Sequence, residues 1–168
     1  TLWSASFIGL LFTQFLTAIN DNVFRWLIIG IGKDYYPDNV GMILTLGTVC
    51  FVVPYLVLAA FAGYLADRFD KARVIFLCKV AEIVIMGLGV VAILSQQIWF
   101  LFFVVALTGA QSALFAASKR GCIPEILKPN KIPGANGLFG LSTVAAIIIG
   151  MGVGGFLKDQ TGQYGLDN

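Results

Sequence analysis

A short polar cluster interrupts an otherwise apolar stretch near the start of the chain. It consists of Asn20, Asp21 and Asn22, with Arg25 following closely. In an α-helix, Gln14, Asp21 and Arg25 share one face, because residues three, four and seven apart lie one above the other. Asp21 and Arg25 also have the i, i+4 spacing of an ion pair. A carboxylate, a guanidinium and neighbouring amides offer both signs of charge, so the cluster predicts a site that binds a polar or zwitterionic group.

Two further polar groups lie later in the chain. Lys79 and Glu82 stand at i and i+3, which suits an ion pair on one helix. We predict such a pair, and Glu82, the deeper of the two, is also a candidate substrate or ion ligand. Gln111 and Ser112 interrupt another apolar run, and a Gln in this setting more often bonds between helices than to a ligand.

The residues for most catalytic and metal sites are missing from the sequence. It contains no His, which excludes His-based triads and His metal sites. Cys50, Cys78 and Cys122 lie far apart without metal-ligand spacing, and we interpret them as free thiols. No nucleophile motif or phosphate-binding loop occurs, and a net charge of +2 is too small to indicate nucleic-acid binding. The sequence thus predicts no enzyme, metal or cofactor.

The composition predicts an all-α membrane protein. Apolar residues make up 58% of the chain and charged residues 12%, against about 25% charged in ordinary soluble domains. Several apolar runs reach the ~20 residues that a helix needs to cross a bilayer. They are too long for strands and lack period-two alternation. The five predicted spans are residues 4–31, 40–66, 74–94, 98–117 and 133–157.

Details within these runs predict how the helices pack. Pro54 indicates a kink, and Pro133 suits the first turn of its helix. Ala146, Gly150 and Gly154 are spaced by four, which forms a face of small residues for close helix packing. Residues 118–132 are predicted as a longer connection with a short interfacial helix at 124–127.

Ionisable residues inside a spanning helix are costly and usually face protein or a water-filled cavity. The Gln14–Arg25 stripe can therefore line a substrate cavity, or it can be a neutralised pair that only holds helices together. We favour the cavity, because holding helices together needs two residues and here more polar groups are crowded.

Basic residues predict the orientation. The connections after the second and fourth runs carry seven of them, and those after the first, third and fifth carry only Lys33 and Lys158. The positive-inside rule places the first set, and the N-terminus, in the cytoplasm. The seven are Arg68, Lys71, Arg73, Lys119, Arg120, Lys128 and Lys131.

The stretch 63–73 (GYLADRFDKAR) resembles the signature loop between helices two and three of the major facilitator superfamily, roughly G-x-L-A-D-R-x-G-R-[RK]. It departs from that pattern at Asp70 and Ala72. Gly63 is expected to permit close helix approach. The charged residues are expected to form charge-assisted hydrogen bonds that bias conformational states, and a plain anchoring loop is the alternative. These residues are Asp67, Arg68, Lys71 and Arg73.

Other segments resemble the lysophospholipid transporter branch of that superfamily. They are residues 14–16, 20–25, 79–82, 109–111, 115–119 and 133–138. This resemblance implies movement of lysophospholipid from the outer to the inner leaflet of the bacterial inner membrane. It also implies a fused or associated acyltransferase and acyl-carrier-protein synthetase. Residues 103–109 lack the Arg, and 150–155 the Gly-Pro pair, of many proton-driven drug antiporters.

The superfamily builds each half from six helices in three-helix repeats, so five helices imply an incomplete N-terminal half whose C-terminal partner half is absent. In an alternating-access mechanism, Asp21 and Arg25 are predicted to bind the headgroup, with Asn20, Asn22 and Gln14 as helpers. Two alternatives are a transporter of a soluble metabolite or drug and a non-transporting membrane anchor of a fused acyltransferase. An anchor has no need of charges inside the membrane.

Overall fold

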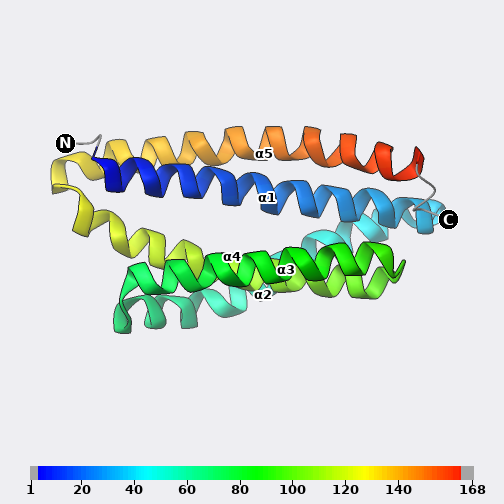
Figure 1. Cartoon of the computed structure of the whole chain (residues 1–168), viewed down its shortest axis with the longest axis horizontal. Coiled ribbons are helices and arrows are strands. Elements are labelled where there is room, and N and C mark those ends of the chain that lie inside the picture. The colour runs from blue at the N-terminus through cyan, green and yellow to red at the C-terminus, as the bar shows by residue number, and fades with distance from the viewer. Residues whose placement is uncertain (1–3, 164–168) are drawn as a thin grey trace.

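The computed structural model describes residues 4–163, apart from the side chains of residues 66, 67 and 161–163, and consists of long helices that run up and down (Figure 1). Among the described residues, five helices are long and apolar enough to cross a membrane, which confirms the predicted all-α membrane fold. Two short 3-10 turns, Pro37–Asn39 and Pro129–Lys131, precede α2 and α5. The helices are α1 (Ala5–Tyr35), α2 (Val40–Arg68), α3 (Lys71–Leu94), α4 (Ile98–Ile126) and α5 (Ile132–Gln163).

The starts of two helices are set by side-chain caps. The Ser4 hydroxyl accepts a hydrogen bond from the Phe7 amide at 3.3 Å at the start of α1. At the start of α3, the Asp70 carboxylate accepts from the amides of Ala72 and Arg73 at 2.9 and 3.3 Å. Such caps satisfy amides that have no partner within the helix. Asp70 thus has a local structural role at the position where the signature loop usually has Gly.

The fourth helix is longer than predicted, and the prediction of a loop from residue 118 was wrong. The helix continues to Ile126 and includes Pro124. A Pro inside a helix costs about 3 kcal/mol because it removes one hydrogen bond and crowds the preceding turn. Cys122 and Ile123 are buried in a cluster with Phe7 and Phe139. Burial of this added helical segment against α1 and α5 offsets the cost. No local signal in the sequence reveals this burial.

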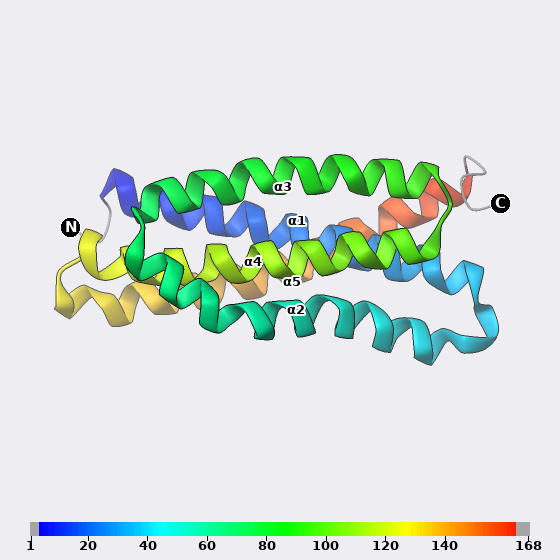
Figure 2. The same cartoon turned by 90° about the horizontal axis from the view of Figure 1, so that it is seen from below.

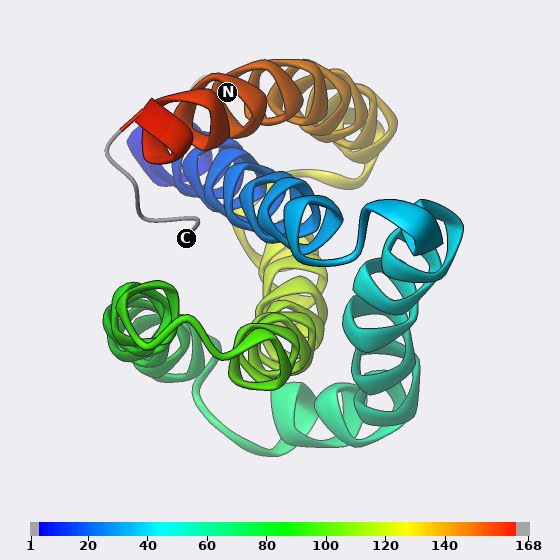
Figure 3. The same cartoon turned by 90° about the vertical axis from the view of Figure 1, so that its right-hand side faces the viewer.

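Two central helices, α1 and α4, cross in the middle of the bundle (Figure 3). The α1 helix packs extensively along α5, and α4 packs along both α2 and α3. Figure 2 shows α2 and α3 on opposite sides of α4. The Gln111 side-chain amide of α4 donates to the Cys78 carbonyl of α3 at 3.0 Å. Gln111 therefore bonds between helices, as predicted.

Small residues bring the helix pairs close together. Ala146, Gly150 and Gly154 are all buried, and a Cβ on Gly150 would lie 2.6 Å from Cβ of Asn22 on α1. This confirms the predicted small-residue face. Gly109 of α4 lies directly against the backbone of Phe51 on α2.

The close helix approach expected at Gly63 is not seen among the described residues. A Cβ at Gly63 would have no neighbour within 4 Å among the described residues. This part of α2 therefore does not need a small residue for packing within these five helices.

The outer surface of the bundle is apolar. Large side chains such as Ile83 and Trp99 are 74% and 70% exposed. Exposed apolar surface of this extent is unfavourable in water and favourable in lipid. The polar side chains described next lie on the inner faces of α1 and α4.

Candidate functional site

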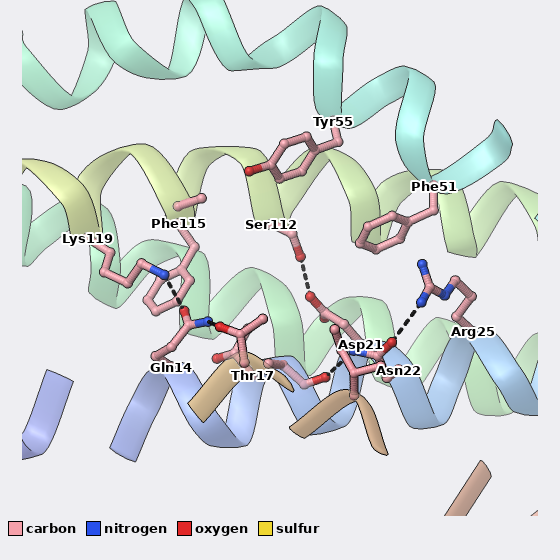
Figure 4. Close-up of a pocket in the computed structure, with 14 residues that line it drawn as sticks. Gln14, Thr17, Asp21, Asn22, Arg25, Phe51, Tyr55, Ser112, Phe115 and Lys119 are labelled. Atoms are coloured by element: carbon pink, nitrogen blue, oxygen red, sulfur yellow. Dashed lines mark hydrogen bonds between the residues drawn. The ribbon is translucent and has the colours of Figure 1, made fainter. Parts of the chain in front are cut away.

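A cavity of about 320 Å³ lies between α1, α2, α4 and α5 (Figure 4). The first helix supplies most of its polar wall, since the stripe predicted from the sequence faces it. Phe51 and Tyr55 of α2 and Phe115 of α4 supply aromatic walls. The charged and hydrogen-bonding residues that line it are Gln14, Thr17, Asp21, Asn22, Arg25, Ser112, Lys119 and Thr143.

Asp21 lies in the middle of this cavity and is only 8% exposed. Its Oδ2 accepts a hydrogen bond from the Ser112 hydroxyl of α4 at 2.5 Å. Its Oδ1 is buried and has no hydrogen-bond partner among the described residues. A buried carboxylate oxygen without a donor is unfavourable. Asp21 therefore keeps one acceptor that no described residue satisfies.

The predicted ion pair between Asp21 and Arg25 was wrong. Neither carboxylate oxygen of Asp21 lies within 4 Å of a nitrogen of the Arg25 guanidinium, and the ion pairs among the described residues are formed by others. Arg25 instead donates to the Asn22 side-chain oxygen at 2.7 Å, and its guanidinium lies 5.2 Å from the Phe51 ring centre. Asp21 is held by Ser112 on α4, whereas Arg25 is held by Asn22 on its own helix and by Phe51 on α2. The two side chains are therefore held separately.

Lys119 occupies one end of the cavity, although the sequence pattern placed it in a loop after the fourth helix. Its Nζ donates to the Gln14 side-chain oxygen at 2.7 Å and lies 5.1 Å from the Phe139 ring centre. The Gln14 amide in turn donates to the Thr143 hydroxyl at 3.1 Å. Had the fourth helix been extended, the spacing of Ser112 and Lys119 by seven residues would have placed both on one face.

Asn20 and Glu82 belong to a different network. The Asn20 amide donates to Glu82 Oε1 at 3.2 Å, and the Lys79 ammonium pairs with Glu82 Oε2 at 2.5 Å. Lys79 also donates to the Thr17 hydroxyl and lies 4.1 Å from the Phe115 ring centre. The predicted Lys79–Glu82 pair is confirmed. Asn20 and Glu82 line a groove between α1 and α3 rather than the cavity around Asp21.

The signature-loop residues lie away from the cavity, mostly within helices. Arg68, at the end of α2, donates to the Tyr64 hydroxyl at 2.5 Å, and Lys71 at the start of α3 forms an ion pair with Glu125 of α4. Arg73 is exposed in the first turn of α3. The side chain of Asp67 lies outside the described residues. The Lys71–Glu125 pair joins two helix ends, the kind of contact that the motif predicted.

Comparison with known proteins agrees with this architecture. The sequence pattern of the Major Facilitator Superfamily matches residues 10–165. Similar proteins named "Lysophospholipid transporter LplT" include one from Serratia proteamaculans, 35% identical over 94% of this chain, and one from Photorhabdus laumondii, 35% identical over 90%. A third, from Cronobacter sakazakii, is 32% identical over 95%.

The chain spans 38%, 36% and 38% of the lengths of these three relatives, respectively. No solved structure matches it. The assignment rests on five membrane-length helices among the described residues, a polar cavity between them, the signature loop and a pattern match over nearly the whole chain. This multi-pass membrane chain belongs to the major facilitator superfamily.

Proposed function

We propose that the protein containing this chain transports lysophospholipid from the outer to the inner leaflet of a bacterial inner membrane by alternating access. The relatives' names support this substrate class. The chain would supply one wall of the pathway, and a C-terminal half would supply the other. An acyltransferase, fused or associated, would consume the lipid that arrives.

The observation that carries the proposal is the unsatisfied Oδ1 of Asp21, which is buried beside a cavity that is also lined by the cationic side chains of Arg25 and Lys119. An ethanolamine headgroup carries an ammonium and a phosphate. The ammonium would donate to Asp21, and the Arg25 guanidinium would bind the phosphate through charge-assisted hydrogen bonds. Asn22 and Gln14 would orient the two cationic side chains, as they do in the structure.

The surroundings suit an amphiphile. A cavity of about 320 Å³ accommodates a headgroup, whereas an acyl chain needs separate apolar surroundings. Phe51 and Phe115 line the cavity next to the polar groups. The start of an apolar tail would pack against these rings while the headgroup stays in the polar stripe, and the rest of the tail would remain in lipid. A non-transporting anchor would have no use for this arrangement.

Flipping of a fluorescent lipid tests the proposal. The full-length protein is reconstituted in vesicles. Lysophosphatidylethanolamine that carries a nitrobenzoxadiazole group is then added to the outer leaflet. Loss of quenching by external dithionite reports movement to the inner leaflet. We expect protein-dependent movement that unlabelled lysophosphatidylethanolamine competes away. Absence of lipid movement, with uptake of a soluble metabolite instead, would contradict the lipid assignment and keep the transporter.

Orientation gives a separate prediction. With Lys119 inside the cavity, the end of the bundle with the α2–α3 and α4–α5 connections still has six basic residues, against Lys33 and Lys158 at the other end. We therefore propose that this end is cytoplasmic. Cys122 is buried, so exposed positions serve as probes in a cysteine-free variant. Asn130→Cys should react with an impermeant thiol reagent only from the cytoplasm, and Asp38→Cys only from outside. The reverse pattern would invert the topology.

A further inference from the structure

Two cations line the same cavity on opposite sides of Asp21 (Figure 4). The Arg25 guanidinium donates a hydrogen bond to the Asn22 side-chain oxygen, and the Lys119 ammonium donates one to the Gln14 side-chain oxygen. These two α1 residues are eight positions apart, or roughly 12 Å along the helix axis. The two cations are therefore held at separate points of the cavity, one on each side of Asp21.

We infer that Lys119 is a second phosphate-binding residue, which takes the headgroup phosphate from Arg25 as the lipid moves toward the cytoplasmic end. This inference rests on the proposed lysophospholipid function. Asp21 lies between the two cations, so the ammonium can stay on its carboxylate while the phosphate moves from one side of it to the other. Each cation then serves a different stage of transport, entry at Arg25 and advance at Lys119.

The partners of Lys119 support a ligand role. Among the described residues, no carboxylate lies within 4 Å of its Nζ, which contacts a neutral amide and an aromatic ring. A cation in a spanning helix is costly unless an anion or water compensates for its charge. Lys79 offers the contrast, because Glu82 neutralises it. Lys79 thus has a structural role in an ion pair, whereas Lys119 lies at the cavity with its charge uncompensated.

A purely structural Lys119 would only hold α1 and α4 together through Gln14. The two roles differ in kinetics. A residue that accepts the phosphate after entry affects the maximal rate and leaves the concentration dependence of entry nearly unchanged. A structural residue affects thermal stability and the amount of folded protein instead.

The test measures initial rates of lysophosphatidylethanolamine movement over a range of concentrations, with the full-length protein in vesicles. We expect Lys119→Gln to lower kcat at least tenfold with KM within threefold of the parent. Arg25→Gln should raise KM at least tenfold. Lys119→Arg, which keeps the charge, should retain at least a third of kcat. Lys128→Gln, which removes an exposed lysine just beyond α4, is the control and should behave like the parent.

Chemical rescue separates charge from packing. In a background without other cysteines, Lys119→Cys should be slow and should regain kcat after reaction with an aminoethyl methanethiosulfonate. The neutral hydroxyethyl reagent should give no recovery. Equal recovery with both reagents, or failure of both Lys119→Gln and Lys119→Cys to fold, would show a structural lysine and overturn the inference.

The outcomes also separate this inference from the proposed function. If the parent protein moves no lysophospholipid, the proposed function fails. If the parent moves it and Lys119→Gln leaves kcat unchanged, the function stands and the second phosphate position is wrong. If Lys119→Gln raises KM as Arg25→Gln does, with kcat unchanged, both cations act at entry and no transfer between them takes place.

Discussion

Replacing Asp21 by Asn is expected to lower movement of lysophosphatidylethanolamine about 10- to 150-fold, since a hydrogen bond to a charged group contributes about 1.5–3 kcal/mol. Asn keeps the size of the side chain and an oxygen that can accept from the Ser112 hydroxyl. The variant should therefore fold and insert like the parent. It loses the negative charge that the headgroup ammonium needs. The vesicle assay with purified full-length protein measures the effect.

A second substrate provides the control for this variant. Lysophosphatidylglycerol has a phosphate but no ammonium, so Asp21→Asn should slow it less than the ethanolamine lipid. Equal losses for the two headgroups would show that Asp21 does not recognise the ammonium. Near-normal rates for the ethanolamine lipid would remove Asp21 from the site, though not from the fold.

The double variant Asp21→Asn with Arg25→Gln should not regain transport. If the two residues formed an isolated ion pair, removing both charges would relieve the cost of leaving one of them unpaired. In the structure they have separate partners, Ser112 for Asp21 and Asn22 for Arg25. Each substitution therefore removes its own contact with the headgroup. Recovery of transport in the double variant would argue for a pair that only holds the protein together.

Replacing Gly109 by Ala is expected to destabilise the protein by about 3 kcal/mol or more, at the upper end of the usual cost of overpacking. The added methyl group would overlap the Phe51 carbonyl, which is backbone within α2 and cannot rotate away. The α2 and α4 helices must then separate, and Phe51 and Tyr55 move with α2 away from the cavity. We expect a lower midpoint of thermal aggregation in detergent and at least tenfold slower lipid movement.

Gly87→Ala is the matched control, because the same methyl group is added in α3 where nothing lies within 4 Å among the described residues. Ala has the higher helix propensity, so this variant should be at least as stable as the parent. Equal thermal midpoints for Gly109→Ala and Gly87→Ala would show that α2 and α4 do not approach each other this closely in the purified protein.

Local patterns in the sequence were sufficient to predict the helices and some of their contacts. Lys79 and Glu82 lie three residues apart on one helix, so their pairing depends on helix geometry alone. Ala146, Gly150 and Gly154 form a small-residue face by their spacing, whatever helix packs against it. The stripe on α1 was also identified as cavity-lining, because a costly polar face in a membrane must be turned inward.

The sequence by itself determined a bundle of five membrane-spanning helices with a polar stripe on the first, because span length, composition and helical periodicity are properties of short segments. Only the tertiary structure decided how that stripe is divided, with Asp21 at the cavity and Asn20 at the α3 groove. Asp21 finds its donor 91 residues away, and Lys119 reaches the cavity because α4 continues past the predicted end. Such partners are chosen by the crossing of whole helices, and no local spacing specifies where two helices cross.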